Sequence, residues 1–315
     1  MTEEPRRILV TGASGFVGGH LLPRLAAVCP ESALLTPAFD IRDPAAVEEA
    51  LDDCRPDVCV HLAGVSAVTA AQQDGERAWE VNLHGTLHLA QAILRQVPLC
   101  RLVFISSADA YGSSYRLGAR LSEQVALAPM NTYGASKAAA DLALGSMVGQ
   151  RLRVVRLRPV NHTGPGQTPR FVVPAFARQI ARIAAGMQEP ALNVGNIDTL
   201  RDFLDVRDVC AAYIACVAHC GSLNSGTILN IASGEPRRIR EILTDLLQLA
   251  GITADIRTDQ SRVRRDDLPV TAVDASRARD LLQWEPAIPW EQTLQDVLND
   301  WRTRIYSEQP GQGQL

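Results

Sequence analysis

The chain has 315 residues and a mass of 34.1 kDa; 46% of its residues are hydrophobic, 21% are charged, and its formal net charge is −4. This composition excludes a wholly disordered chain, and no apolar run reaches the ~18 residues that a transmembrane helix needs. The acidic balance argues against a protein that coats nucleic acid, and the N-terminus lacks the apolar stretch of a signal peptide, so we expect a cytoplasmic protein with no membrane or nucleic-acid partner.

Strands and helices alternate through the first half of the chain. The expected strands are 7–11, 33–36, 57–62, 102–106 and 153–157, and the expected helices are 17–25, one that starts at Pro44, about 75–96, and 133–147. Asp43 can cap the helix that begins at Pro44. Because alternation of this kind produces a parallel sheet covered on both faces, the predicted fold class is α/β, a doubly wound (Rossmann) sheet.

A glycine-rich turn joins the first expected strand to the first helix. Thr11 is followed by Gly12, Gly15 and Gly18, the spacing of a dinucleotide-binding turn. The first glycine permits the tight turn, the second lets the backbone approach a pyrophosphate, and the third allows close helix–strand packing. The helix N-terminus offers unpaired N–H groups and the positive end of its dipole to the phosphates. A plain glycine-rich turn is the alternative, but this position in an α/β chain favours a bound dinucleotide.

The pattern changes after Pro159. Residues 161–170 have the composition of a loop rich in Gly, Pro and Thr. The later elements expected are helices at 172–185, 205–220, 237–249 and 290–302 and a strand at 228–231. We therefore expect a Rossmann domain of residues 1–160, with about 205–233 packing back onto it. Residues 161–204 and 234–315 would form a smaller C-terminal α/β lobe that binds the substrate.

Three side chains suggest chemistry at the end of one strand. Tyr133 and Lys137, the only lysine of the chain, lie one turn apart on the same helix face. A cation there should lower the phenol pKa, and the ammonium can also hold ribose hydroxyls. Tyr133 could exchange a proton with a substrate oxygen while a hydride moves at the adjacent carbon. Ser107 follows the strand 102–106 and could hydrogen-bond that oxygen. The alternative is an ordinary surface pair on a helix.

Several motifs recur in a fixed order over the first 160 residues. They are Thr11-Gly12-x-x-Gly15-x-x-Gly18, Asp40-Ile41-Arg42-Asp43, Ala63-Gly64, Val81-Asn82-x-x-Gly85-Thr86, Ser106-Ser107-x-x-x-Tyr111-Gly112 and Tyr133-x-x-x-Lys137. On these motifs the chain resembles the extended branch of the short-chain dehydrogenase/reductase superfamily, the NAD-dependent epimerase/dehydratase family, which acts on nucleotide sugars. The resemblance implies that Ser107, Tyr133 and Lys137 are catalytic.

The same resemblance implies a nicotinamide cofactor. The residues that it assigns to the cofactor are Gly12, Gly15, Phe16, Val17, Gly18, Asp40, Ile41, Leu62, Ala63, Gly64, Asn82, Tyr133, Lys137 and Pro159. Asp40 and Ile41 would flank the adenine. Neither an acid nor an arginine directly follows the second strand, so NAD(H) and NADP(H) both stay open, with a slight preference for NADPH because the acid is missing.

Motifs of the second half narrow the resemblance. The segments 158–167, 194–196 and 201–208 resemble the reductases of GDP-4-keto-6-deoxy-D-mannose, which form GDP-D-rhamnose. The residues implied to bind the substrate are Ser107, Ala108, Asp109, Asn161, Arg178, Arg201 and Arg264. Arginines suit the diphosphate end because a guanidinium can bind phosphate oxygens in a bidentate way. The implied reaction is the NAD(P)H-dependent reduction of the 4-keto group of a nucleotide-linked 6-deoxyhexose. The nucleotide base and the product stereochemistry stay open.

One stretch separates two reactions of this family. Family dehydratases carry Thr-Asp-Glu or Thr-Ser-Glu where this chain has Ser107-Ala108-Asp109, and their carboxylates remove the C5 proton and help expel the C6 hydroxyl. Ala108 can transfer no proton and Asp109 is one methylene shorter than glutamate, so elimination is harder here than reduction. We therefore favour a reductase, with a nucleotide-sugar 4-epimerase or 4,6-dehydratase as the alternative. A non-catalytic nucleotide-binding sensor is a remote alternative, because it would not need the complete trio.

Two further expectations concern partners and metals. In this family, helices equivalent to about 76–96 and 133–149 form a four-helix bundle between two subunits, so the resemblance implies a homodimer. The alternative is that these faces pack on the chain's own sheet. The seven cysteines form no Cys-x-x-Cys pair and the six histidines show no ligand spacing, so we expect core cysteines and no metal.

Overall fold

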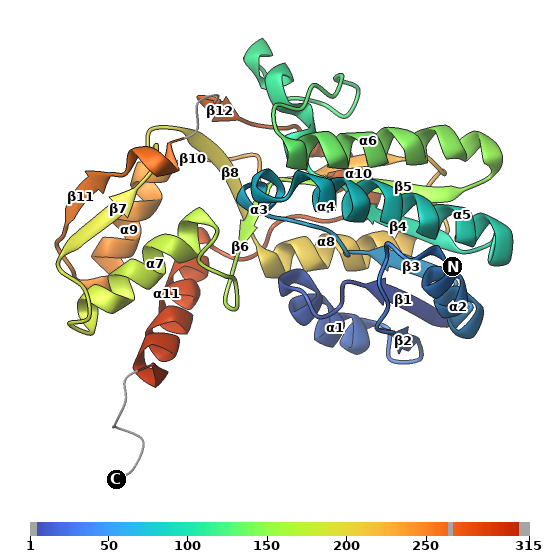
Figure 1. The fold of residues 1–315 in the computed structure, drawn as a ribbon, viewed down its shortest axis with the longest axis horizontal. Coiled ribbons are helices and arrows are strands. Elements are labelled where there is room, and N and C mark those ends of the chain that lie inside the picture. The colour runs from blue at the N-terminus through green and yellow to red at the C-terminus, as the bar shows by residue number, and fades with distance from the viewer. Residues whose placement is uncertain (1–4, 264–266, 309–315) are drawn as a thin grey trace, which may run out of the picture.

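A six-stranded parallel sheet forms the larger part of the protein (Figure 1). The structure is a computed structural model that describes residues 5–263 and 267–308. The strands are β1 (Arg7–Thr11), β2 (Ala33–Leu35), β3 (Val58–His61), β4 (Arg101–Ile105), β5 (Arg153–Pro159) and β9 (Ile228–Ile231), in the order β2-β1-β3-β4-β5-β9. The strand order reverses between β1 and β3, which is where doubly wound sheets bind ligands. The predicted α/β class is confirmed.

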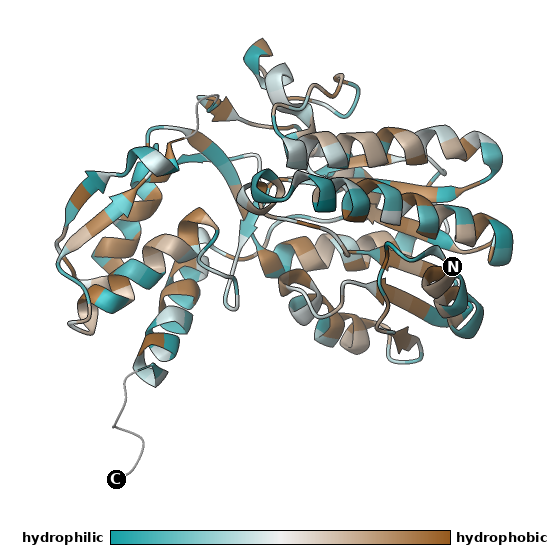
Figure 2. Ribbon diagram, in the orientation of Figure 1, coloured by the Kyte–Doolittle hydropathy of each residue, from teal (hydrophilic) through white to brown (hydrophobic). Residues whose placement is uncertain are grey.

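Helices cover both faces of the sheet because successive strand residues point in opposite directions. Ile8 and Val10 of β1 pack in one buried cluster with α1 (Phe16–Val28) and α8 (Val206–His219). Leu9 packs in a second cluster with α2 (Pro44–Cys54), α5 (Thr86–Gln96) and α6 (Thr132–Met147). In Figure 2, β1 and β3 are brown, whereas the helices that cover the sheet mix hydrophobic and hydrophilic residues. As predicted, Asp43 caps α2 through the backbone N–H groups of Ala45 and Ala46.

The long helix expected at about 75–96 contains a π-helical segment. It consists of α4 (Gly75–Trp79), a π-helix (Glu80–Gly85) and α5. A π-bulge of this kind often marks a functional site, because it turns side chains that a regular α-helix would place elsewhere. Here the segment contains Asn82, which is buried.

A smaller group of elements has its own hydrophobic cluster. It contains α7 (Val172–Ala184), α9 (Ile239–Ala250) and α11 (Trp290–Ser307), with β7 (Ala191–Val194) paired to β11 (Asp255–Thr258) at the left of Figure 1. Their buried residues include Phe176, Leu243 and Leu298. After residue 205 the chain returns to the large sheet, where β9 pairs with β5. The division of the chain into two domains at the predicted residues stays a prediction.

Several short elements lie outside the predicted set. They are α3 (Val68–Gln73), β6 (Asn161–Thr163), β7, β8 (Leu200–Asp205), β10 (Pro236–Arg238), β11, β12 (Val270–Thr271), α10 (Ser276–Leu282) and 3-10 turns at Ala108–Leu117, Val148–Gln150 and Gln260–Arg262. The loop expected at 161–170 was wrong at its start, because β6 pairs with β8, a strand that sequence reasoning did not find. Within residues 5–263 and 267–308, no helix combines the length and the apolar character needed to span a bilayer.

Candidate active site

A cavity of about 540 Å³ opens at the C-terminal ends of β1, β3, β4 and β5. Its walls come from the glycine turn after β1, the segment Leu62–Thr69 after β3, and the segment Ile105–Asp109 after β4. Tyr133 and Lys137 of α6, the segment from Pro159 to Thr163, and Arg201 and Phe203 of β8 complete it. The glycine turn and the predicted catalytic trio therefore share one cavity.

The glycine turn leaves the N-terminus of α1 free for an anion. Gly12 has a φ of +69°, and a Cβ on it would lie 2.5 Å from the backbone N of Ala63. A Cβ on Gly18 would lie 2.2 Å from the carbonyl oxygen of Ala13, so only glycine at this position lets α1 lie this close to the turn. Gly15 caps α1 without a side-chain hydrogen bond, and the first turn holds no acid. These features fit the pyrophosphate of a dinucleotide.

A buried hydrogen-bond chain fixes the two strand ends beneath this turn. The backbone N–H of Ala63 donates to Thr11 Oγ1 (3.3 Å), which lies 2.7 Å from His61 Nδ1. His61 Nε2 lies 3.0 Å from Thr86 Oγ1, whose hydroxyl donates to the carbonyl of Asn82 at 2.7 Å. Burial, aided by the charge of Lys137, lowers the pKa of His61 to about 3, so its ring stays neutral. His61 therefore ties β1, β3 and the π-helix together.

Asn82 holds the segment after β3 in place. Its Oδ1 accepts the backbone N–H of Val65 at 2.8 Å, and its Nδ2 donates to Val65 O at 3.1 Å and to Ser136 Oγ at 2.9 Å. A Cβ on Gly64 would lie 3.0 Å from Asn82 Oδ1 and 3.3 Å from Lys137 Nζ. Any side chain at Gly64 would therefore displace Asn82 or Lys137.

The three side chains predicted to be catalytic lie where β4 ends. Lys137 is buried, and its Nζ donates to the carbonyl oxygen of Ile105 at 2.8 Å and lies 5.4 Å from the centre of the Phe104 ring. Ser107 is buried, its Oγ accepts the backbone N–H of Asp109 at 3.1 Å, and its side chain hydrogen-bonds the phenol of Tyr133. Burial lowers the pKa of Lys137 to about 8.

The expected effect on the Tyr133 phenol was wrong in sign. We expected the lysine cation to lower its pKa, but burial raises the pKa of Tyr133, and the nearby Asp109 carboxylate raises it further. The hydrogen bond from Ser107 lowers the pKa by a smaller amount. Two physical reasons apply: the ring is removed from water, and the lysine ammonium is held by the carbonyl of Ile105.

An ion pair anchors α6 from behind the site. Asp141, one turn beyond Lys137, is fully buried and accepts hydrogen bonds from Arg156 Nη1 (3.0 Å), Arg158 Nη2 (2.9 Å) and Arg158 Nε (2.9 Å). Although burial alone would raise the pKa of Asp141, the hydrogen bond and charge of Arg158 lower it. The pair fixes α6 against β5, and so it fixes the positions of Tyr133 and Lys137.

The remaining predicted residues fall into two groups. On the cavity wall lie Gly12, Gly15, Phe16, Val17, Gly18, Leu62, Ala63, Gly64, Ala108, Asp109, Pro159, Asn161 and Arg201. Arg201 is ion-paired with Asp267. Asp40, Ile41 and Asn82 do not line it: Asp40 forms an ion pair with Arg42, and Ile41 is buried against Gly85. Arg264 lies outside the described residues.

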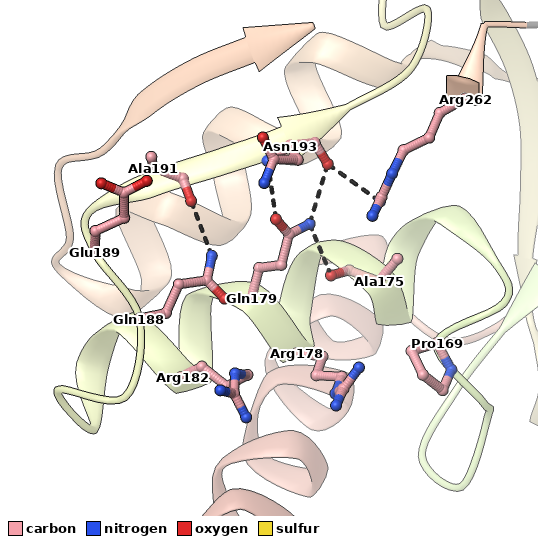
Figure 3. Close-up of a pocket in the computed structure, with 10 residues that line it drawn as sticks. All are labelled: Pro169, Ala175, Arg178, Gln179, Arg182, Gln188, Glu189, Ala191, Asn193 and Arg262. Atoms are coloured by element: carbon pink, nitrogen blue, oxygen red, sulfur yellow. Dashed lines mark hydrogen bonds between the residues drawn. The ribbon is translucent and has the colours of Figure 1, made fainter. Parts of the chain in front are cut away.

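Arg178 lies in a second cavity of about 270 Å³ between α7 and β7 (Figure 3). Arg178 and Arg182 project from the same side of α7, and Arg262 approaches from the far end. Gln179 fixes the strand by accepting Asn193 N–H at 2.9 Å and donating to Asn193 O at 3.2 Å. Three arginines and one acid, Glu189, line this cavity, and two of the arginines have ion-pair partners: Arg182 with Glu308 and Arg262 with Asp259.

Sequence reasoning missed several residues of the main cavity. They are Ser14, Val65–Thr69, Tyr115, His162, Thr163, Gln167, Arg170, Phe171, Phe203, Tyr213 and Thr271. Most belong to β6, to β8 or to loops that only tertiary pairing brings to the cavity. His162 and Gln167 stood within a quoted motif, Arg158–Gln167, but the motif alone does not show which side chains face inward.

A family model and a curated relative both match most of this chain. The model of the NAD dependent epimerase/dehydratase family matches residues 8–232. The GDP-6-deoxy-D-mannose reductase of Pseudomonas aeruginosa is 38% identical over 306 residues, which are 96% of this chain and 99% of that protein.

Solved structures agree over nearly the whole chain. RMD from Pseudomonas aeruginosa complexed with NADPH has a TM-score of 0.86 and 36% identity, covering 95% of this chain and 99% of that one. The UDP-glucose 4-epimerase of Thermus thermophilus in complex with NAD has a TM-score of 0.82 and 26% identity, covering 94% of this chain and 99% of that one.

Proposed function

The chain belongs to the NAD dependent epimerase/dehydratase family, as its motifs predicted, and we propose that it is an NAD(P)H-dependent reductase of a nucleotide-linked 4-keto-6-deoxyhexose. The substrate we propose is GDP-4-keto-6-deoxy-D-mannose, which would be reduced to GDP-D-rhamnose. The observation that carries the proposal is that the glycine turn and Ser107, Tyr133 and Lys137 line one cavity. The likeness to a GDP-6-deoxy-D-mannose reductase over 96% of the chain supports the choice of sugar.

The residues of the cavity suit the reduction of a ketone. When bound, NAD(P)H would supply the hydride for the carbonyl carbon. Tyr133 donates its phenolic proton to the C4 oxygen, and Ser107 hydrogen-bonds the same oxygen. The phenolate left on Tyr133 is stabilised by its hydrogen bond with Ser107. Because the pKa of Tyr133 is raised, the phenol keeps the proton that this step requires.

The same cavity is less suited to the elimination that a 4,6-dehydratase carries out than to the reduction of a ketone. A 4,6-dehydratase needs groups that move protons next to the sugar C5 and C6, and Ala108 has none. Asp109 lines the cavity, and its carboxylate raises the pKa of Tyr133, which keeps the phenol protonated. A 4-epimerase is the second candidate, because the fold matches a UDP-glucose 4-epimerase solved with NAD over 94% of the chain.

We propose NADPH as the preferred reductant. Leu35 ends β2, and the next residue is Thr36, so no acid stands where a carboxylate would bind the ribose hydroxyls of NAD and repel a phosphate there. The relative of 36% identity was solved with NADPH. The proposed preference is tested by comparing kcat/KM for NADPH and NADH at one substrate concentration.

We propose that the nucleotide end of the substrate extends from the main cavity toward the second one. Asn161 and Arg201 line the main cavity, and Arg178 lines the second. Pro169 lines the second cavity, and the next residue, Arg170, lines the main one. The basic second cavity suits an electron-rich or anionic part of a nucleotide. Arg264 is kept as a proposed contact.

We also propose a homodimer built on α4, α5 and α6. Trp79 and Leu142 on these helices are 36% and 59% exposed, which leaves apolar surface for a partner. Size-exclusion chromatography with light scattering tests the dimer.

The proposed compartment is the cytoplasm, because all seven cysteines are free thiols, the form that reducing compartments maintain.

The experiment that tests the function is direct. Purified protein is mixed with GDP-4-keto-6-deoxy-D-mannose and NADPH, and oxidation of NADPH is followed together with formation of GDP-D-rhamnose. No turnover of this substrate, combined with NADPH-independent conversion of a UDP-hexose to its 4-epimer and release of bound NAD on denaturation, would replace the reductase with the epimerase.

A further inference from the structure

Ser136 connects α6 to a wall of the main cavity without lining that cavity itself. It lies on α6 between Tyr133 and Lys137, and the side chains of Ser136 and Asn82 are both buried. Asn82 Nδ2 donates to Ser136 Oγ at 2.9 Å, and the Ser136 hydroxyl donates to the carbonyl oxygen of Tyr133 at 2.9 Å. The hydroxyl therefore serves as an acceptor and as a donor inside the protein, away from water.

Asn82 cannot turn without losing a hydrogen bond. Its Oδ1 accepts the N–H of Val65, and its Nδ2 donates to Val65 O and to Ser136 Oγ. The backbone carbonyl of Asn82 accepts the hydroxyl of Thr86 at 2.7 Å. Val65 lines the main cavity, next to Gly64. The position of this cavity wall is therefore transmitted to Ser136 through one fixed amide.

A serine at this position of α6 needs a reason, because alanine is the better helix former. Ala138 and Ala140 are buried on the same helix, so alanine suits this part of it. Helix propensity alone would therefore favour alanine at position 136. The serine hydroxyl instead gives Asn82 Nδ2 its second partner, and without it a buried N–H of Asn82 would lose its hydrogen bond.

The same contact determines where Lys137 lies. A Cβ on Gly64 would lie 3.0 Å from Asn82 Oδ1 and 3.3 Å from Lys137 Nζ, so these groups pack closely around Gly64. On its other side, Lys137 Nζ donates to Ile105 O at 2.8 Å. Because Tyr133 and Lys137 belong to one helix, a shift of α6 against Asn82 would move both relative to the cavity wall.

We propose that Ser136 is a positioning residue for the reduction, because its hydroxyl holds Tyr133 and Lys137 in place against the wall of the main cavity. The inference rests on the proposed function, since it needs a ketone that is reduced in this cavity. A misplacement of about 1 Å can cost up to about 10² in rate, because reacting atoms must be close and aligned. Loss of the hydroxyl should therefore slow the chemical step more than it weakens binding.

The test is Ser136→Ala, assayed well below its melting temperature with GDP-4-keto-6-deoxy-D-mannose and NADPH. Rapid mixing gives the rate of NADPH oxidation in a single turnover at saturating substrate, and calorimetric titration gives the Kd for NADPH. We expect the single-turnover rate to fall by about tenfold or more and the Kd to change by less than about threefold.

Thr293→Val is the matched control, because it also removes one buried hydroxyl. Thr293 lies on α11, donates to Asp205 Oδ2 at 2.7 Å and lines neither cavity. Both variants should lower the melting temperature, whereas only Ser136→Ala should slow the single turnover.

Three results would overturn the inference. They are a Ser136→Ala rate equal to that of the wild type, a slowing that Thr293→Val shares, and a rise in the Kd for NADPH as large as the loss of rate. A wild-type protein that does not oxidise NADPH with this substrate would overturn the proposed function, and the inference with it.

Discussion

At the scale of single residues, the site combines a neutral acid with a cation of reduced pKa. Tyr133 keeps its proton because burial and Asp109 raise its pKa, whereas Lys137 loses part of its charge near pH 8 because burial lowers its pKa to about 8. The two shifts have the same origin, the removal of both groups from water, and opposite consequences. They leave the Tyr133 phenol protonated at neutral pH, which is the form that a proton donor in a reduction starts from.

The first prediction concerns Tyr133. Tyr133→Phe removes the proposed proton donor and keeps the ring, so kcat should fall by about 10² or more while the Kd for NADPH changes little. Steady-state assays and calorimetric titration check the two quantities. An unchanged kcat would show that another group protonates the oxygen, and a parallel loss of NADPH binding would show a structural role.

Lys137 gives a pH dependence with a defined sign. Its ordinary pKa of 10.5 falls to about 8, so the ammonium that would hold ribose hydroxyls is lost as the pH rises through about 8. We expect NADPH affinity to be level near about pH 7 and to weaken by up to about tenfold per unit above pH 8. Lys137→Met should bind weakly at every pH and show no step. A wild-type affinity that is constant up to about pH 9 contradicts this role.

Spacing predicted the trio because local geometry determines it. Tyr133 and Lys137 share a helix face whatever surrounds the helix, and Ser107 follows a strand whose C-terminal end must face the cavity. The sign of the Tyr133 pKa shift depends on burial, which is a tertiary property. Sequence patterns do not show how deeply a particular side chain is buried.

At the scale of elements, the glycine turn combines strain with close contact. Gly12→Ala places a Cβ 2.5 Å from Ala63 N at a φ of +69°, so the turn must move. We expect the Kd for NADPH to rise at least about tenfold and the melting temperature to fall. Gly19→Ala is the control: no atom lies within 4 Å of its Cβ, and alanine favours the helix, so stability should rise slightly with binding unchanged. If both variants bind NADPH equally well, the turn does not hold the dinucleotide.

The strands of the large sheet were predicted well, and the strands outside it were not. The strands of the large sheet are apolar runs, so β1, β3, β4, β5 and β9 appear in the sequence. By contrast β6, β10 and β12 have two or three residues, and β11 is exposed throughout. Their pairing partners lie far along the chain, so no local pattern marks them. The π-helix at Glu80–Gly85 is likewise invisible, because its residues still fit a helical pattern.

At the scale of the whole molecule, the main core is built from both halves of the chain. One buried cluster joins Ile8, Leu21 and Leu157 to Tyr213, Leu229 and Trp284. Loop 161–170 adds a second connection: the backbone N–H of Gly166 donates to Asp300 Oδ2 of α11 at 2.9 Å, and Pro165 O lies 2.7 Å from His20 Nε2 of α1. The helix that follows the glycine turn is therefore held partly by residues from the second half of the chain.

This shared core predicts the behaviour of a truncated chain. Residues 1–160 retain the glycine turn and the trio but lose α8 and β9, so the apolar face of α1 and the edge of β5 become exposed. We expect the fragment to show no cooperative thermal transition and no NADPH binding, measured by circular dichroism and calorimetry. Co-expression with residues 161–315 should restore both, because the missing half of the core returns. A fragment of 1–160 that melts cooperatively and binds NADPH alone would show that the first half is an independent folding unit.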